Sequence, residues 1–403
     1  MREIILLTVA GEDKPGLTSS LTRILANYNV NILDIGQAVI HDTLSLGILM
    51  EVPAASESSP ILKDVIFHAH SQNIQINFTP ISLKAYEDWV LLQGKSRHIV
   101  TVIGETITAD HIAKITKIFA EHQLNIDNIN RLSGRMSLSR ERNRKRPKCI
   151  EFSVRDVVDS SELRAELLKT ATAYCFDIAV QKDHIFRHNY KIVAFDMDST
   201  LIQTEVIVEL AKYAGVETEV HRITESAMRG EIDFDESLRK RVALLKGLDQ
   251  SVLQKTAEQL PLTPGLEKLI KNLQKVSFKT AILSGGFTFF GNYLKDRFNF
   301  DYLYANELEI VNGKLTGRVI GEIINGETKA KYLKEIARKE QVRLEQTIAV
   351  GDGANDLPML QVAGLGIAFH AKPMVRETAE HAISCLGLDA ILYLIGFRDK
   401  DTT

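Results

Sequence analysis

The sequence predicts an α/β protein in which a Rossmann-like, doubly wound parallel sheet with a helical cap follows two small βαββαβ domains. Three observations support this prediction. Strand and helix patterns alternate after residue 190, several of these strands end in polar residues, and one order of strands and helices occurs twice in the first 185 residues. We expect small domains at 1–85 and 96–185, a core at 190–204 and 266–396, and a cap at 205–265.

Length and composition indicate a multi-domain globular protein. At 403 residues the chain exceeds one ordinary core, and its 45% apolar residues suffice for several. A formal charge of −3 shows no overall bias toward nucleic acid, and no apolar run approaches the roughly 20 residues that span a bilayer. The chain opens directly in a strand pattern, and its 3 cysteines are widely spaced. We therefore expect a cytoplasmic protein with no signal peptide and no nucleic-acid or membrane partner.

The first domain has the pattern of a ferredoxin-like fold. Strand patterns at 4–9, 31–40, 44–52 and about 74–78 are interrupted by helical patterns at 17–27 and about 60–72. The second domain repeats this order. Its Thr101-Val-Ile-Gly-Glu corresponds to Thr8-Val-Ala-Gly-Glu, and its Leu124-Asn-Ile-Asp corresponds to Val30-Asn-Ile-Leu. A tandem duplication over roughly residues 1–185 explains both correspondences.

Both domains resemble ACT domains, which are regulatory modules that often bind amino acids at paired interfaces. The turn Asp13-Lys-Pro-Gly-Leu matches the ACT family before the first helix, whereas the second domain has Glu105-Thr-Ile-Thr-Ala there. The resemblance implies an amino-acid site near Asp13, Gly16 and Asn31, and paired modules of this kind favour a homodimer. The alternative is that both domains serve only for packing and dimerisation.

A strongly basic segment lies between the middle strands of the second domain. Residues 135–148 contain seven basic side chains and one acid. This charge would suit binding to a phosphate-rich partner. The segment has no aromatic residue that could stack on bases. We therefore interpret it as a solvated, mobile hairpin loop.

Three predicted core strands end in polar residues. The motifs that follow them are Asp196-Met-Asp-Ser-Thr, Ser284-Gly-Gly and Gly351-Asp-Gly-Ala-Asn-Asp. Parallel strands of a doubly wound sheet present their carboxyl ends at one edge, where ligands bind. One cleft should therefore contain all three motifs.

The acids of this cleft suit phosphoryl transfer. We expect Asp196 to attack phosphorus and Asp198 to protonate the leaving oxygen and later to activate water. Asp352, a carboxylate oxygen of Asp196 and the backbone carbonyl of Asp198 would form a Mg²⁺ site. Asn355 and Asp356 would orient the groups around the metal.

Two further features would hold the phosphate. Ser284 and the N–H groups of Gly285 and Gly286 can bind its oxygens. Lys329, on a predicted helix before the third motif, would supply the positive charge without which the acids repel a phosphate.

Taken together and in this order, Asp-Met-Asp-Ser-Thr, Ser-Gly-Gly, the lysine and Gly-Asp-Gly-Ala-Asn-Asp closely resemble the four motifs of the haloacid dehalogenase (HAD) superfamily of phosphatases. This resemblance implies the HAD fold and an aspartyl-phosphate intermediate.

The segment between the first two motifs is predicted to be helical. Ile207, Leu210, Ala211 and Ala214 form one apolar stripe, and Leu238, Val242 and Leu245 form another. A helical cap here would exclude water and select the substrate. Arg241 lies on the second stripe, and a buried arginine needs an anion, which is either a nearby acid or a substrate carboxylate.

Other cap residues would complete a site for an amino-acid phosphate. Glu205 would complement an ammonium group, and Met228 and Phe234, beside a hinge at Gly230, would close over a small ligand. A carboxylate clamp, an ammonium acceptor and a phosphate site together describe an O-phosphorylated amino acid. Phosphoserine is the compact candidate.

The chain between roughly residues 190 and 395 resembles phosphoserine phosphatases of the SerB type. The stretches that carry the likeness are Asp196–Glu205, Ser237–Val242, Leu283–Phe287 and Val350–Asp356. The resemblance implies that Asp196 is the nucleophile and Asp198 the acid and base, with Asp352 binding Mg²⁺. It implies substrate contacts from Glu205, Met228, Phe234, Arg241, Ser284, Gly285, Lys329 and Asn355. We therefore predict hydrolysis of O-phospho-L-serine in the last step of serine biosynthesis, with L-serine as a candidate effector of the ACT domains.

Two alternatives remain open. The first is a related phosphatase for another small phosphomonoester, such as phosphothreonine or a phosphorylated sugar acid. The second is a non-catalytic amino-acid-binding regulator that keeps the phosphatase fold as a scaffold. The complete set of acids with Lys329 argues against the scaffold, because clustered acids without a metal destabilise a fold.

Overall fold

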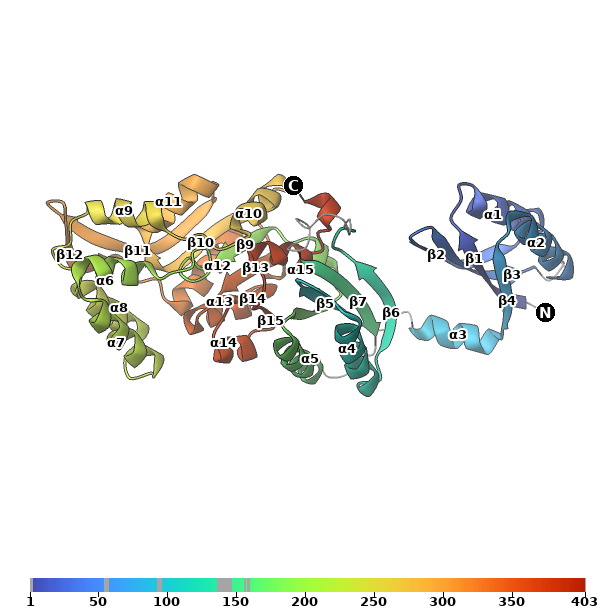
Figure 1. The fold of residues 1–403 in the computed structure, drawn as a ribbon, viewed down its shortest axis with the longest axis horizontal. Helices are drawn as coiled ribbons and strands as arrows, with labels where there is room; N and C mark the ends of the chain where they lie inside the picture. Colours follow the sequence, from blue (N-terminus) through green and yellow to red (C-terminus); the bar gives the residue numbers. More distant parts are fainter. Residues whose placement is uncertain are drawn as a thin grey trace. The chain divides into compact units, whose positions relative to one another are not determined.

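The computed structural model describes residues 3–53, 58–92, 96–135, 147–155, 157 and 160–402 (Figure 1). Met1–Lys95 form one compact unit and Ser96–Thr403 another. Most of the basic segment, at 136–146, lies outside the described residues. Within the described part of the chain, no helix combines the length and apolar character needed to cross a membrane.

The first unit contains a four-stranded antiparallel sheet. Its elements are β1 (Glu3–Glu12), α1 (Leu17–Asn27), β2 (Asn31–Ile40), β3 (Thr43–Val52), α2 (Ser58–Gln72) and β4 (Gln75–Ile81), and the sheet order is β2-β3-β1-β4. Alternate residues of β1 and β3, such as Leu7 and Ile48, are buried against Leu21 of α1 and Val65 of α2. This arrangement confirms the predicted βαββαβ order. A further helix, α3 (Leu83–Leu92), follows β4 and was not predicted.

The second unit begins with a sheet of the same design. Its elements are β5 (Arg97–Gly104), α4 (Ala109–Glu121), β6 (Asn125–Arg131), β7 (Lys148–Arg155), α5 (Ser160–Tyr174) and β8 (Asp177–Lys182), in the order β6-β7-β5-β8. Both sheets carry an irregularity at the same point of the second strand, at Ile32/Asp34 and at Ile126/Asn128. A shared bulge in a shared topology is what a tandem duplication predicts.

A seven-stranded sheet forms the centre of the second unit, in the order β12-β11-β10-β9-β13-β14-β15. Its strands are β9 (Ile192–Phe195), β10 (Lys279–Phe287), β11 (Tyr302–Val311), β12 (Lys314–Ile320), β13 (Thr347–Gly351), β14 (Leu365–Phe369) and β15 (His381–Ile383). All neighbours are parallel except β11 and β12. The chain winds outward from β9 in both directions, which confirms the doubly wound sheet.

Strand β12 pairs antiparallel with β11, unlike the other strands of this sheet. A local turn explains this pairing. Asn312 and Gly313, with φ angles of 50° and 76°, join β11 to β12 directly. An Asn-Gly pair with two positive φ angles is the preferred two-residue turn of a β-hairpin. The signal for this strand was therefore present in the sequence.

Helices cover both faces of the seven-stranded sheet. They are α10 (Leu266–Lys275), α11 (Thr288–Phe298), α12 (Gly326–Lys339), α13 (Leu357–Val362), α14 (Pro373–Thr378) and α15 (Ile391–Leu394). Val193 and Phe195 of β9 belong to a hydrophobic cluster that includes α10, α11 and α15, whereas Ile192 and Ala194 belong to another that includes α12, α13 and α14. Alternation within one strand thus supplies two cores, and for this reason β9 has no polar face.

The segment between β9 and α10 forms four helices (Figure 1). They are α6 (Val206–Ala214), α7 (Glu217–Met228), α8 (Phe234–Ala243) and α9 (Ser251–Gln259). Both predicted stripes are buried in part, through Ile207 and Leu210 on α6 and through Leu238 and Val242 on α8. Gly215, at φ 71°, ends α6 in the left-handed conformation that glycine tolerates best.

Polar contacts join the second ferredoxin-like domain to the part of the chain around the seven-stranded sheet. The buried carboxylate of Asp177, on β8, accepts hydrogen bonds from the N–H groups of Ser384 (2.6 Å) and Cys385 (3.1 Å) just after β15. Asp399 near the C-terminus accepts one from the N–H of Gly134 (2.7 Å). These contacts satisfy groups that burial would otherwise leave unpaired.

Candidate active site

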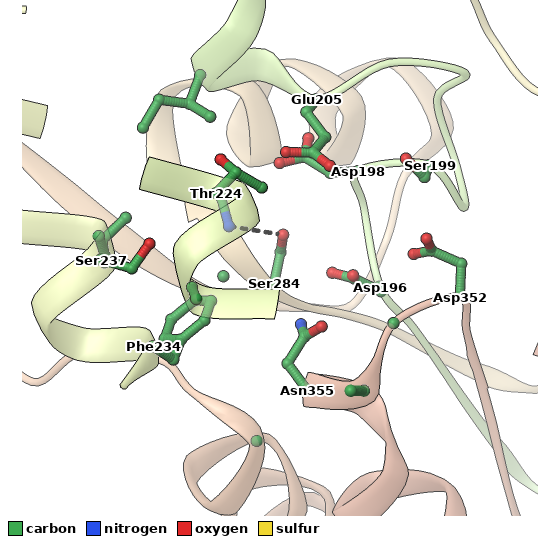
Figure 2. A pocket seen from close by; sticks show the side chains of 18 of the residues that line it. Asp196, Asp198, Ser199, Glu205, Thr224, Phe234, Ser237, Ser284, Asp352 and Asn355 are labelled. Atoms are coloured by element: carbon green, nitrogen blue, oxygen red, sulfur yellow. Dashed lines mark hydrogen bonds between the residues drawn. The ribbon is translucent and has the colours of Figure 1, made fainter. Parts of the chain in front are cut away.

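A cavity of about 770 Å³ opens where β9, β10 and β13 end. Residues from all three predicted motifs line it, and so do cap residues from α6, α7 and α8. Figure 2 shows the acids Asp196, Asp198, Glu205 and Asp352 apart from the cap residues Phe234 and Ser237. The volume lies in the range typical of small-molecule sites.

Asp196 directly follows β9, and among the described residues only its Oδ1 has hydrogen-bonding partners. Its Oδ1 accepts a hydrogen bond from the N–H of Met197 (2.7 Å) and lies 2.9 Å from Lys329 Nζ. The chain then turns sharply, because the N–H groups of Leu201 and Ile202 both donate to the carbonyl of Met197. Ser199 takes a φ of 56° within this turn. The turn is what places two acids of one motif in the same cavity.

Asp198 lies beside the start of the cap. Its Oδ1 accepts a hydrogen bond from the N–H of Val206 (3.3 Å), the first residue of α6. Burial, followed by the charges of Asp196 and Glu205, raises the pKa of Asp198 well above its usual value. A carboxyl that holds its proton suits a general acid. Gly286 makes room for it, since a Cβ there would lie 2.9 Å from Asp198 Oδ2.

Lys329, on the first turn of α12, is completely buried. Its Nζ lies 2.6 Å from Asp356 Oδ1 and 2.9 Å from Asp196 Oδ1. Burial alone lowers the pKa of Lys329, but the two carboxylates outweigh it and raise the pKa above the usual value. Lys329 is not one of the residues that line the cavity. Its positive charge therefore compensates the negative charges of Asp196 and Asp356 from outside the cavity.

Asp356 anchors both the lysine and the third motif. Its Oδ1 accepts the hydrogen bond from Lys329, and its Oδ2 accepts from the N–H groups of Asp352 (3.1 Å) and Gly353 (3.0 Å). Burial and the charge of Asp196 raise the pKa of Asp356, whereas Lys329 lowers it. Both oxygens of Asp356 are thus engaged by the protein.

Three carboxylates form a candidate cation site. Asp196, Asp352 and Asp356 each place one oxygen so that all three oxygens lie within 4.8 Å of one another. Burial, together with repulsion from the other two acids, raises the pKa of Asp352 to about 8. Lys329 offsets only part of the negative charge of these three carboxylates, and hard oxygen ligands suit Mg²⁺. The carboxylate of Asp198 is not in this cluster.

The second motif forms the last part of β10, where the pairing with β11 is irregular between Leu283 and Phe287. Ser284 is fully buried, and its Oγ accepts a hydrogen bond from the N–H of Gly286 (2.9 Å, dashed in Figure 2). Asn306, which was not predicted, donates to the carbonyl of Gly285 (2.8 Å) and accepts from the N–H of Ile324 (2.9 Å). A buried asparagine within the apolar pattern of β11 is the signal that could have identified it. Asn355 also lines the cavity.

Arg241, on the inner face of α8, is 8% exposed. Its Nε donates to the carbonyl of Ser237 (3.4 Å) and its Nη1 to Thr224 Oγ1 (3.5 Å). It forms no salt bridge with any acid among the described residues, so the protein-acid alternative is not observed there. Burial lowers the pKa of Arg241, while Glu205 and Asp198 act in the opposite direction.

The other cap residues lie as follows. Glu205 precedes α6 and lines the cavity, and Phe234 begins α8 with its ring at Gly285. Met228 ends α7, but its side chain lies outside the described residues. Thr224 and Ser237 line the cavity without having been predicted, because a hydroxyl residue within a helical pattern carries no distinctive signal.

In the first unit, the three residues of the candidate amino-acid site are exposed. Gly16 caps α1 with a φ of 91°, and the N–H of Asp13 donates to the carbonyl of Asp42 (2.7 Å). Asn31, at the start of β2, donates to Glu51 Oε2 (3.2 Å). Asp13 and Gly16 thus share one turn, and Asn31 already has a protein partner.

Comparisons with known proteins agree with this organisation. The model of the haloacid dehalogenase-like hydrolase family matches residues 193–361, and ACT-domain models match residues 3–79 and 96–137. The chain is 41% identical over 398 residues to the phosphoserine phosphatase of Streptomyces coelicolor, covering 98% of this chain and 93% of that protein. It is 39% identical over 394 residues to phosphoserine phosphatase SerB2 of Mycobacterium tuberculosis, with coverage of 97% and 93%.

A solved structure extends the likeness to three dimensions. The crystal structure of a HAD family hydrolase from Salmonella enterica serovar Typhi aligns with a TM-score of 0.65 at 33% identity. The alignment covers 74% of this chain and 99% of that one.

Proposed function

The chain belongs to the phosphoserine phosphatases, HAD hydrolases that here follow two ACT domains, and on this premise we propose that it hydrolyses O-phospho-L-serine to L-serine and phosphate. The reaction would be the last step of serine biosynthesis. The observation that carries the substrate assignment is Arg241, which is buried in the cavity wall without a salt bridge to any described acid. A substrate carboxylate supplies the missing anion.

The substrate fits between the cap and the strand ends. Arg241 would bind its carboxylate, Glu205 its ammonium group, and Ser284 with the N–H of Gly285 its phosphate. Phe234 and Met228 would close over the serine carbon atoms. All of these except Met228, whose side chain is not described, line the one cavity. A phosphomonoester without a carboxylate would leave Arg241 unpaired at a cost in binding free energy.

Asp196 would attack phosphorus as the bond to the serine oxygen breaks. Its Oδ1 is held by Met197 and Lys329, and within the described residues its Oδ2 accepts no hydrogen bond, which leaves Oδ2 for the attack. Asp198 gives its proton to the departing serine oxygen. Asp198 then takes a proton from the water that attacks the aspartyl phosphate, which releases phosphate and restores Asp196.

Mg²⁺ is the proposed metal. Asp196, Asp352 and the backbone carbonyl of Asp198 would hold it, and it would offset the negative charge of the phosphoryl oxygens. Asp356 would support the metal ligands without binding the metal itself, since Lys329 and two backbone N–H groups already engage its oxygens. Asn355 would likewise orient the groups around the metal.

Regulation and assembly complete the proposal. The two ACT-domain matches support control by an amino acid, and we assign L-serine as the effector in the region of Asp13, Gly16 and Asn31. A homodimer in the cytoplasm is the proposed form. The domain limits proposed for the chain are those expected from its sequence.

Phosphate release tests the proposal. Rates are measured on L-phosphoserine, phosphothreonine and an aryl phosphate, each with Mg²⁺ or excess EDTA and with or without L-serine. Metal-dependent preference for phosphoserine is expected, and Asp196→Asn should be folded but inactive. Equal rates on all three substrates would overturn the substrate assignment. No release at all would favour the non-catalytic regulator.

A further inference from the structure

The side chain of Ser237 is buried in the cavity wall and has no partner. The residue is 0% exposed, and its Oγ forms no hydrogen bond within the described part of the chain. It lines the same cavity as Arg241, and Figure 2 shows it on the cap side, opposite the acids. A buried hydroxyl without a partner loses its hydrogen bonds to water and gains none in return. Such a group within a binding cavity points to a ligand.

The hydroxyl of Ser237 makes no hydrogen bond to the backbone of its own helix α8. Serine and threonine within helices often donate to the carbonyl four residues earlier, as Thr224 does to Val220 (3.0 Å). In Ser237 only the backbone N–H makes the equivalent bond, to the carbonyl of Asp233 (3.0 Å). Thr224 therefore has no hydrogen left to donate and can only accept from Arg241, whereas Ser237 keeps its hydrogen for another acceptor.

Ser237 lies one helical turn before Arg241. The Nε of Arg241 donates to the carbonyl of Ser237 (3.4 Å), which ties the two residues together on the inner face of α8. A carboxylate offers about four acceptor positions, and an arginine fork occupies two. A carboxylate bound at Arg241 thus needs further donors, and Ser237 is a buried donor one turn away.

We propose that Ser237 is a specificity-determining residue whose hydroxyl donates to the substrate carboxylate that Arg241 binds. This assignment rests on the proposed function. It deepens that function, since the cap would then recognise the carboxylate through two side chains of one helix. A substrate without the carboxylate leaves the hydroxyl unpaired, so Ser237 favours phosphorylated amino acids over phosphorylated amino alcohols.

The test compares Ser237→Ala with the wild type on two compounds. O-Phospho-L-serine has the carboxylate, and O-phosphoethanolamine lacks it but keeps the ammonium and phosphate. For phosphoserine we expect kcat/KM to fall about 10- to 100-fold, mostly through a higher KM, the loss expected for a hydrogen bond to a charged group. For phosphoethanolamine, measured as a substrate or as a competitive inhibitor, the wild type and the variant should agree within about twofold, because the lost contact is absent.

Thr256→Val is the matched control. Thr256 on α9 is also buried, and its hydroxyl also has no partner among the described residues, but it does not line the cavity. Its loss should leave kcat/KM unchanged for both compounds. The Tm of Ser237→Ala should be no lower than that of the wild type, because no protein contact is lost. Ser237→Cys, with a weaker donor of similar size, should give an intermediate kcat/KM for phosphoserine.

Three results would count against the assignment. Unchanged kcat/KM of Ser237→Ala on phosphoserine, beside an active wild type, would overturn the role of Ser237 alone. An equal loss on both compounds, or a fall in Tm that parallels the loss of activity, would show a structural role instead. A wild-type protein that releases no phosphate from phosphoserine would overturn the proposed function and this assignment together.

Discussion

The ring of Phe234 lies against Gly285, so closely that a Cβ on Gly285 would be 2.8 Å from the ring atom Cζ. Phe234 begins the cap helix α8, and Gly285 belongs to the end of β10 that is proposed to hold phosphate. Asn325 Nδ2 also donates to Asp235 Oδ1 (3.1 Å), which joins the cap to the start of α12. The cap thus contacts the core beside the site of chemistry, and the glycine makes this contact possible.

Gly285→Ala should therefore weaken catalysis by displacing the cap. A shift of about 1 Å in a catalytic geometry is worth about a 100-fold change in rate, and we expect kcat/KM to fall about 10- to 100-fold. Adding Phe234→Leu, which removes the tip of the ring, should restore part of the loss. Gly47→Ala, where no atom lies within 4 Å of the new Cβ, is the control. Steady-state kinetics that do not distinguish the two alanine variants would contradict the steric argument.

Lys329→Met should reduce stability as well as activity. The variant leaves Asp196 and Asp356 buried without their cation, and breaking a buried ion pair in this way costs about 3–5 kcal/mol. Urea unfolding measures the loss. Lys331→Met removes an exposed lysine paired with Glu322 and should cost less than about 1 kcal/mol. Similar unfolding midpoints for the two variants would refute the assigned role of Lys329.

Mg²⁺ should raise the Tm of the wild type, because an ion that binds only the folded state stabilises it. In Asp352→Asn, which removes one of the three clustered carboxylates, this rise should be much smaller. Thermal unfolding with Mg²⁺ and with EDTA gives the comparison without reference to turnover. The exposed acid Asp110 provides the control variant Asp110→Asn, whose response to Mg²⁺ should match that of the wild type. An undiminished rise in Asp352→Asn would exclude Asp352 as a ligand.

His381 should make the second unit less stable in mild acid. Burial, with a smaller contribution from Arg164, lowers the pKa of His381 from 6.5 to about 3. As the pH falls below about 6.5, the unfolded chain binds this proton first, so the free energy of unfolding decreases by up to about 1.4 kcal/mol per pH unit until the pH nears 3. Urea unfolding at pH 7.5 and 5.5 measures the decrease.

The variant His381→Asn isolates this effect. It should lose less stability than the wild type between the two pH values, whereas His221→Asn, at an exposed cap position, should lose as much as the wild type. If His381→Asn keeps the full pH dependence of the wild type, then another group is responsible.

The amino-acid sequence alone predicted the fold because local patterns report burial directly. The apolar run of β9 indicated a strand buried on both faces, and the helix at 17–27 has the predicted bounds. Parallel strands bring their carboxyl ends to one edge, so the sequence alone places the motifs starting at Asp196, Ser284 and Gly351 in one cleft. The Asn312-Gly313 pair also indicates a hairpin turn by its residue types alone.

Only the tertiary structure decided which side chains meet. Lys329 contacts Asp356, Asn306 holds the carbonyl of Gly285, and the hydroxyl of Ser237 is left without a partner. The partners in these contacts lie 21 or more residues apart in the chain. Periodicity shows that a residue is buried but not what surrounds it, because the neighbours depend on how distant helices and strands pack. The chemistry of the cleft could therefore be predicted by residue type, whereas its hydrogen bonds became known only with the packed structure.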